Sequence, residues 1–339
     1  MESNVYFSFI IPVYNRPQEI DELLASITQL FYKKQFEVVI IEDGSEQSSK
    51  EVIANYKESL DITYLQKKNT GPGDSRNFGM KHAKGSYFLI LDSDVLLPPH
   101  YLKSVEESLK KDFVHCFGGP DKFHESFSQI QKAIDYAMTS FLTTGGIRGN
   151  KIRVQNFEPR SFNMGLSKEA FKASGGFGQI HPGEDPDLSI RLNQLGYTTK
   201  LFPASYVYHK RRIDWAKFQK QTYKFGQVRA ILIKWHPNRF KITYLFPSFF
   251  MLALLIAGLF TMLDIYVFIQ FFLFYFVLIL LDSISKTKSL SISVLAVLAT
   301  IIQFTSYGLG FMLTWFSINV LDKDEQEEFP ELFFKKNAD

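Results

Sequence analysis

The stretch FLILDSDVLLPPHYL, residues 88–102, is the part of the sequence that decides the fold. Four apolar residues lead into Asp92, Ser93 and Asp94, and a second apolar run and two prolines follow. The first apolar run predicts a buried strand, and the two aspartates stand where that strand ends. Two aspartates after a strand often only make a turn or cap a helix. An Asp-x-Asp pair therefore needs support from the rest of the chain before it predicts a metal site.

The composition allows one large domain or two smaller ones, because the chain has 339 residues. Its net charge of +3 is small and does not indicate a nucleic-acid partner. The charge is unevenly distributed: residues 209–241 hold ten Lys or Arg and one acidic residue, whereas residues 322–339 hold seven Asp or Glu and three Lys. Cys116 is the only cysteine, so no intrachain disulfide is possible, which fits a reducing compartment.

Strand-like and helix-like segments alternate through residues 1–200. The first apolar run has no basic residue before it and predicts a first strand rather than a signal peptide. Continuous apolar strands separated by helices predict an α/β fold, with a mostly parallel sheet that carries helices on both faces. Ligands of such sheets bind beyond the carboxyl ends of the strands, where Asp43, Asp92 and Asp94 stand. The expected strands are 6–14, 36–45, 61–68 and 86–94, and the expected helices are 16–30, 48–60 and 71–85.

These strand ends predict a particular chemistry. Two carboxylates at positions i and i+2 can share a hard divalent cation with phosphate oxygens. Arg76, in the Gly-rich turn NTGPGDSRN, is able to pair with a phosphate, although the same turn could simply connect a strand to a helix. No Gly-x-Gly-x-x-Gly motif follows the first strand, which argues against a nicotinamide-binding oxidoreductase.

Five segments occur together in a familiar order and spacing: SFIIPVYNRPQEIDELLASI, VVIIEDGS, GPGDSRNFGMKHAKGSYFLILDSDVLLP, NMGLSKEAFKASGGFG and GEDPDLSIRLNQLGY. Over roughly residues 5–212 the chain resembles the inverting family 2 glycosyltransferases, which have the GT-A fold. The resemblance implies a Rossmann-like GT-A catalytic domain in residues 1–212.

The resemblance also implies a role for each matching residue. Asp185 would be the catalytic base that takes the proton of the acceptor hydroxyl, with Glu184 beside it. Asp92, Asp94 and His209 would hold Mg²⁺ or Mn²⁺, which neutralises the leaving diphosphate. The residues expected to bind the nucleotide-sugar are Pro12, Tyr14, Asn15, Glu42, Asp43, Arg76, Asp92 and Asn163. Two alternatives stay open. Asp185 could cap a helix and have no catalytic role, and His209 could contact a lipid phosphate and bind no metal.

The last third of the chain is expected to be membrane-bound. Residues 243–263, 265–281 and 289–321 are uncharged runs, and a spanning helix needs about 20 apolar residues. The third run is too long for one perpendicular helix, so it would tilt or break near Gly308. The basic segment 213–241 mixes aromatic and cationic residues and predicts a helix in the membrane interface. The predicted layout is thus a domain at 1–212, this helix, about three spans at 242–321 and an acidic tail at 322–339.

Flanks rich in Lys and Arg stay cytoplasmic. The sequence therefore predicts a multi-pass protein of the cytoplasmic (inner) membrane, with a cytoplasmic catalytic domain, three spans and the acidic tail outside. An even number of spans, with the third run as a hairpin, is the alternative.

The predicted function is transfer of one sugar from a UDP- or GDP-sugar to a lipid-linked glycan or polyprenyl phosphate in cell-surface polysaccharide biosynthesis. A processive polysaccharide synthase is one rival, although its Gln-x-x-Arg-Trp motif is replaced by GQVRA and IKW. A catalytically silent membrane scaffold with a nucleotide-binding fold is the other.

Overall fold

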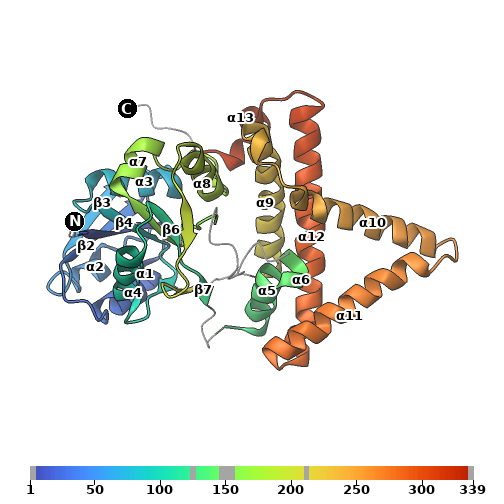
Figure 1. The fold of residues 1–339 in the computed structure, drawn as a ribbon, viewed down its shortest axis with the longest axis horizontal. Coiled ribbons are helices and arrows are strands. Elements are labelled where there is room, and N and C mark those ends of the chain that lie inside the picture. The colour runs from blue at the N-terminus through green and yellow to red at the C-terminus, as the bar shows by residue number, and fades with distance from the viewer. Residues whose placement is uncertain (1–4, 123–126, 145–156, 210–213, 335–339) are drawn as a thin grey trace. The chain divides into compact units, whose positions relative to one another are not determined.

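The computed structural model describes residues 5–122, 127–144, 157–209 and 214–334, and the chain divides into two compact units (Figure 1). The sheet unit comprises residues 1–124, 151–210 and 333–339. The helical unit comprises residues 125–150 and 211–332. The predicted layout did not foresee two of these assignments, because 125–150 leaves the sheet unit and 333–339 returns to it.

A seven-stranded sheet forms the centre of the sheet unit, in the order β3-β2-β1-β4-β8-β6-β9. The strands β3, β2, β1 and β4 run parallel, whereas β8 is antiparallel to both of its neighbours. This arrangement confirms the predicted mostly parallel sheet. The strands are β1 (Phe7–Val13), β2 (Phe36–Asp43), β3 (Ile62–Lys67), β4 (Tyr87–Leu91), β6 (Cys116–Gly118), β8 (Asn163–Ser167) and β9 (Thr199–Leu201).

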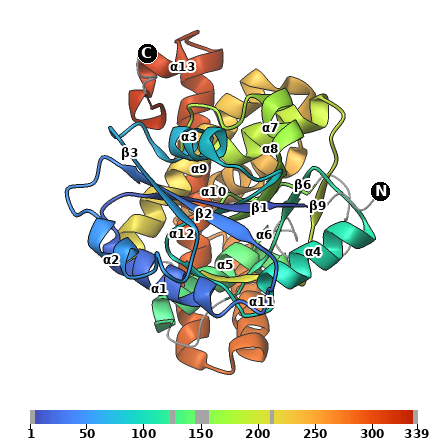
Figure 2. The ribbon, with the colours of Figure 1, turned by 90° about the vertical axis from the view of Figure 1, so that its left-hand side faces the viewer.

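Helices cover both faces of this sheet (Figure 2). Successive residues of a strand point to opposite faces, so Phe9 and Ile11 of β1 enter one core while Ile10 enters the other. The first core also contains apolar residues of α1 (Pro17–Thr28), α2 (Lys50–Ala54) and α4 (Tyr101–Lys111). The second contains residues of α3 (Pro72–His82), α7 (Lys168–Ser174) and α8 (Glu184–Gln194). The continuous apolar runs of the sequence are therefore strands buried on both sides.

One predicted helix is shorter than expected. The sequence predicted a helix over 48–60, but α2 ends at Ala54. Beyond it the backbone continues in turns whose N–H groups donate to carbonyls three residues back, as Lys57 does to Ala54 and Ser59 to Tyr56. The segment therefore continues as tight turns and not as a regular α-helix.

Three helices of the helical unit are long and apolar enough to cross a membrane, spanning Ile242–Thr261, Val267–Thr287 and Leu290–Asn319. The third, α12, is one continuous helix and does not break at Gly308. Its glycines allow close backbone contacts instead, because a side chain at Gly308 would press on Pro247 and one at Gly310 would overlap the carbonyl of Tyr223. The helices of this unit are α5 (Gln129–Thr139), α6 (Phe141–Thr144), α9 (Trp215–Trp235), α10 (Phe246–Thr261), α11 (Val267–Thr287), α12 (Leu290–Asn319) and α13 (Glu325–Glu328), with short 3₁₀ turns η1 (Pro237–Arg239), η2 (Ile242–Leu245) and η3 (Pro330–Leu332).

The predicted position of the acidic tail is wrong. The sequence placed it across the membrane from the basic segment. In the structure, the Glu325 carboxylate lies 2.9 Å from the ammonium group of Lys234 and accepts a 2.7 Å hydrogen bond from the indole of Trp235, both at the end of the basic helix α9. Opposite charges thus bring the two segments together, so they lie on one side of any membrane that the apolar helices cross.

Candidate active site

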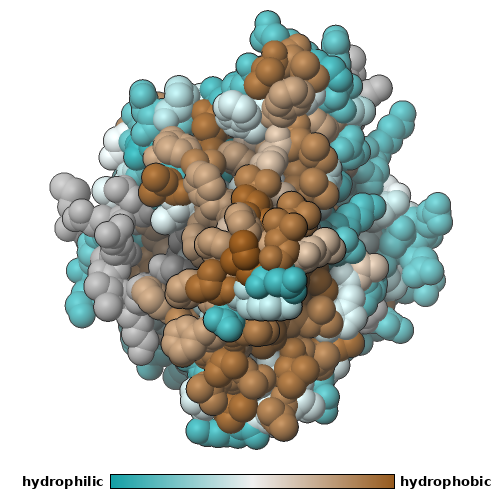
Figure 3. Space-filling view, turned by 90° about the vertical axis from the view of Figure 1, so that its right-hand side faces the viewer, coloured by the Kyte–Doolittle hydropathy of each residue, from teal (hydrophilic) through white to brown (hydrophobic). Residues whose placement is uncertain are grey.

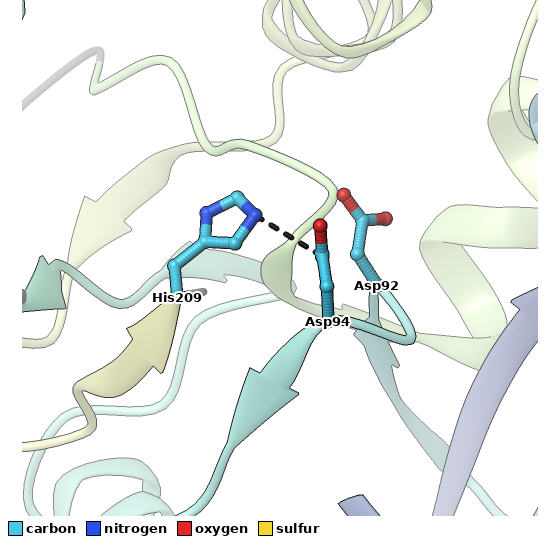
Figure 4. A group of neighbouring side chains, drawn as sticks. All are labelled: Asp92, Asp94 and His209. Carbon is cyan, nitrogen blue, oxygen red and sulfur yellow. Dashed lines mark ion pairs between the residues drawn. The ribbon is translucent and has the colours of Figure 1, made fainter. Parts of the chain in front are cut away.

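Three potential metal ligands meet beyond the end of β4 (Figure 4). Asp92 and Asp94 occupy the turn between β4 and β5 (Val95–Leu96). The small sheet of β5, β10 (Val207–His209) and β7 (Asp121–Lys122) pairs His209 with Val95, which places the imidazole beside Asp94. One ligand atom from each of the three residues lies within 4.8 Å of the others. The Nε2 atom of His209 is 3.2 Å from Asp94 Oδ1.

This group fits a hard divalent cation. Two carboxylates and an imidazole are donors that suit Mg²⁺ or Mn²⁺. Asp94 Oδ1 is buried and faces Nε2 of His209 at 3.2 Å without forming a hydrogen bond of good geometry, so a bound cation would satisfy it. Burial opposes ionisation of Asp94, but His209 and Arg16 lower its pKa to about 2, which keeps it a charged ligand.

Arg76 connects this group to the start of α8. Its Nη2 atom donates to Asp92 Oδ1 at 2.8 Å, and its Nη1 atom donates to Glu184 Oε1 at 3.0 Å. The residue is 3 % exposed, and although burial opposes its charge, Asp92 and Glu184 raise its pKa. A contact with a donor diphosphate would require one of these nitrogens to exchange its partner. The predicted donor-binding role of Arg76 stays a prediction.

Two neighbouring carboxylates begin α8 and have opposite pKa shifts. Burial raises the pKa of Glu184, but His181, whose Nδ1 is 3.0 Å away, and Arg76 together lower it to about 2. For Asp185, burial and the charge of Glu184 raise the pKa to about 6, against the opposing effect of Arg76 and Arg160. Asp185 Oδ1 has no hydrogen-bond partner among the described residues. The pair is thus divided into one permanent anion and one carboxylate that can take up a proton near neutral pH.

The expected nucleotide-binding residues lie at the ends of β1 and β2. Tyr14 follows β1 and is 49 % exposed, whereas Pro12 lies within β1. Asp43 ends β2 and is almost buried, because it accepts hydrogen bonds from Lys67 at 2.9 Å and from the backbone N–H groups of Thr70 and Gly71, each at 3.0 Å. These contacts hold the loop before α3 against the end of β2.

Glu42 and Asn15 are used within the fold. Glu42 accepts from the N–H of Ser49 at 2.8 Å and from the hydroxyl of Tyr64 at 3.1 Å. Asn15 has a left-handed φ of 54° and accepts from the N–H of Glu46 at 2.8 Å. Both side chains therefore shape the loop that follows β2. Their contacts give no support for the prediction that they bind the donor.

The structure does not fit the predicted role of Asn163 in donor binding. Asn163 is fully buried at the start of β8. Its Oδ1 accepts from the hydroxyl of Tyr101 at 2.7 Å, and its Nδ2 donates to the carbonyl of Ser205 at 2.8 Å. A buried amide with both ends hydrogen-bonded to the protein is a structural link between strand and loop.

The sequence reasoning missed two cations of the site. Arg16 directly follows Asn15, and its Nη1 atom lies 3.1 Å from Asp94 Oδ2. Lys67 ends β3 and pairs with Asp43 in the sheet register. The contact of Lys67 with Asp43 could have been predicted from the sequence, because parallel strands that end together place their last side chains side by side. No sequence signal connects Arg16 to a residue 78 positions away.

Comparison with known proteins assigns the fold and the family. The family model "Glycosyl transferase family 2" matches residues 8–175. The chain is 43 % identical over 128 residues to an uncharacterized glycosyltransferase of Rickettsia conorii, covering 37 % of this chain and 20 % of that protein. It is 37 % identical over 100 residues to the poly(ribitol-phosphate) beta-N-acetylglucosaminyltransferase TarS of Staphylococcus aureus, covering 29 % of this chain and 18 % of TarS. The match thus spans only about a fifth of each of these relatives.

A solved structure extends the likeness to nearly the whole chain. The mannosyltransferase PcManGT from Pyrobaculum calidifontis, solved with GDP-Man and Mn²⁺, superposes with a TM-score of 0.59 at 16 % identity. The alignment covers 95 % of this chain and 89 % of that one, and at this identity it shows a shared fold. The matched profile, the parallel sheet and the carboxylates at its edge lead to one conclusion: residues 8–175 form a family 2 glycosyltransferase domain, and that domain has the GT-A fold.

Proposed function

We propose that this chain is an inverting, metal-dependent glycosyltransferase that moves a sugar from a nucleotide-sugar to an acceptor at a membrane. The observation that carries the proposal is the Arg76 link. One guanidinium joins Asp92 of the candidate metal group to Glu184 beside Asp185, at 2.8 and 3.0 Å. The leaving group and the attacking group of a sugar transfer must meet at one anomeric carbon, and this link holds the two sets of residues in one site.

Asp92, Asp94 and His209 would hold the cation. A bound Mg²⁺ or Mn²⁺ would screen the negative charge that develops on the leaving nucleoside diphosphate. Arg16 lies on the Asp94 carboxylate and adds positive charge at the same place.

Asp185 supplies the base. As the acceptor hydroxyl oxygen bonds to the anomeric carbon, the bond from that carbon to the diphosphate breaks, and Asp185 takes the hydroxyl proton. The pKa of about 6, raised by burial and by Glu184, keeps Asp185 largely ionised at neutral pH yet basic enough to accept the proton. A single displacement inverts the anomeric centre and needs no covalent intermediate.

The donor is proposed to be a UDP- or GDP-sugar. Tyr14 and Asp43 lie at the ends of adjacent strands, where doubly wound sheets bind nucleotides. PcManGT, which shares the fold, was solved with GDP-Man. A lipid-linked glycan or polyprenyl phosphate is the proposed acceptor, since either would present its hydroxyl or phosphate at a membrane surface.

Membrane association is supported by the exposed apolar surface of α10, α11 and α12 (Figure 3). Phe333 pairs with Ile180 within the sheet unit, so the chain returns to that unit after its last apolar helix. This return supports an even number of membrane crossings, and α10 and α11 are the proposed pair because α12 is the most buried of the three. We place the sheet unit on the cytoplasmic side of the inner membrane, because nucleotide-sugars are made in the cytoplasm.

A processive synthase is the second candidate. Residues of this chain are 24 % identical over 235 residues to the chondroitin synthase of Escherichia coli, covering 34 % of that protein. Product length separates the candidates, because transfer of one sugar gives a single product and processive synthesis gives a ladder or a long polymer.

The test is a donor screen on the full chain in detergent with Mn²⁺. We expect nucleotide release from one class among UDP-, GDP-, CDP- and dTDP-sugars, and loss of that release in Asp94→Ala. Binding of no nucleotide by a folded protein would overturn the proposal. Nucleotide binding without turnover in the presence of membrane-lipid acceptors would instead favour a silent scaffold.

A further inference from the structure

A short segment beyond the apolar helices docks beside the candidate active site. Phe333 forms an antiparallel bridge with Ile180, and the N–H of Phe334 donates to the carbonyl of Gln179 at 3.1 Å. Both phenylalanines belong to the sheet unit, although residues 211–332, which precede them, belong to the helical unit. The bridged loop leads directly into His181 and the start of α8, where Glu184 and Asp185 lie.

On one side, the Phe334 ring contacts the loop at Gly71, next to the proposed nucleotide-binding residue Asp43. It lies directly on Gly71, where any side chain would overlap it. Gly71 has a φ of 91°, which L side chains rarely adopt, and its N–H donates to Asp43 Oδ2. The ring therefore rests on the loop that holds the proposed nucleotide-binding carboxylate.

On its other side the same ring contacts His181, which lies beside the proposed catalytic pair Glu184 and Asp185. Its centroid is 5.7 Å from that of His181, whose Nδ1 is 3.0 Å from Glu184 Oε1. Gly183, between His181 and Glu184, has a φ of 122°, so this loop too depends on glycine. One aromatic side chain thus packs between two glycine-containing loops, each of which orients a carboxylate of the site.

We propose that Phe334 is a positioning residue of the transferase: it holds the Gly71 loop against Asp43 and His181 against Glu184, so that donor binding depends on docking of the Phe333–Phe334 segment. The inference rests on the proposed function. It makes the segment that follows the apolar helices a part of the active site. In such a glycosyltransferase, the donor site is completed by the Phe333–Phe334 segment, which follows the membrane-associated unit in the sequence.

The kinetic test compares three variants of the full chain in detergent with Mn²⁺ and the donor identified by the screen. Phe334→Ala is expected to raise the donor KM about tenfold with a smaller change in kcat, because the lost contact orients the donor site. Phe334→Tyr, which keeps the ring, is expected to restore the wild-type KM. Phe329→Ala removes a half-buried phenylalanine that belongs to the helical unit; it is the control and is expected to leave the KM unchanged.

The docking itself is tested without activity. Bridged antiparallel partners have Cα atoms about 4.5–5.5 Å apart, which suits a disulfide. Oxidised Ile180→Cys/Phe333→Cys protein should cross-link internally, whereas each single variant should not. Cys116 does not interfere, since it is buried and burial raises the pKa of its thiol.

The outcomes are distinct. A cross-link together with the KM rise and its rescue by tyrosine supports the inference. Failure to cross-link overturns it, and so does a Phe334→Ala variant that loses thermal stability with an unchanged donor KM, because Phe334 would then only stabilise the fold. If wild-type protein releases nucleotide from no donor, the proposed function fails, and the cross-link still reports whether the segment docks.

Discussion

The sheet unit and the helical unit place their apolar side chains in opposite ways. In the sheet unit, Phe9, Ile10 and Ile11 of β1 are all fully buried between two helical layers. In the helical unit, Phe271 and Phe274 of α11 are 68 % and 63 % exposed. Monomeric soluble proteins rarely expose so large a contiguous apolar surface. The sheet unit is thus stabilised by its own core, whereas α10 and α11 need an apolar environment such as lipid.

The polar residues differ in the same way. The sheet unit gathers Asp92, Asp94, Glu184 and Asp185 near one edge of its sheet, and Arg76 joins Asp92 to Glu184. The helical unit has ion pairs within a helix, as Lys286 with Asp282 one turn away, and between segments, as Lys234 with Glu325. Charged side chains gathered as in the sheet unit are typical of catalytic sites. In the proposed function, the sheet unit carries catalysis and the helical unit carries the membrane anchor.

The largest expected effect tests whether the chemistry belongs to the sheet unit. Asp185→Asn is expected to lower turnover about 10³-fold, since it removes the general base while keeping the size of the side chain. Nucleotide binding should persist. Asp187→Asn is the matched control, because that carboxylate instead contacts Arg191 at 2.9 Å. Transfer assays on both proteins decide the point, and unchanged turnover in Asp185→Asn would remove Asp185 from the mechanism.

A second pair of variants tests the contrast in apolar packing directly. Phe9→Ala is expected to lower the free energy of unfolding by about 3–5 kcal/mol, because it opens a cavity in a fully buried core. Phe274→Ala is expected to change it by less than about 0.5 kcal/mol in detergent, because that ring is largely exposed. Denaturant unfolding of both variants measures the difference. Equal losses would mean that α11 packs against protein rather than lipid.

A third prediction concerns the cation. Asp94→Ala is expected to weaken Mn²⁺ binding at least about tenfold, because it removes a charged donor from the group with Asp92 and His209. Glu107→Ala, an exposed carboxylate on α4, serves as the control. Calorimetric titration with Mn²⁺ in the absence of donor measures the change. Equal affinity in wild type and Asp94→Ala would mean that these three residues do not form the metal site.

Much of the fold could be predicted from the sequence, because long apolar runs constrain it strongly. The strands β1, β2 and β4 and the three apolar helices follow directly from hydrophobic pattern and length. The Asp92, Asp94 and His209 group came from a family resemblance, and the β5–β10 pairing brings these residues together.

The errors have local physical causes. Asn163 was assigned to the donor because its motif matched, but burial of its amide depends on Tyr101 and Ser205, which no short motif reveals. The acidic tail was misplaced because charge rules for loops take no account of a specific pair such as Glu325 and Lys234. Long-range contacts of this kind are set by the assembled fold rather than by the local sequence.

The smallest predicted effect is the dependence of turnover on pH. Asp185 must be deprotonated to act, and its pKa is raised to about 6 by burial and Glu184, so kcat/KM should fall about tenfold per pH unit below that value. The groups that act on Asp185 also predict the direction of change. Glu184→Gln removes a neighbouring negative charge and should move the acid limb to lower pH, whereas Arg160→Gln removes a positive charge and should move it to higher pH. Opposite shifts in the two profiles would identify Asp185 as the titrating base. If the acid limb of the kcat/KM profile moves with neither substitution, it reports the titration of another group. The opposite pKa shifts of Glu184 and Asp185 would then have no role in catalysis.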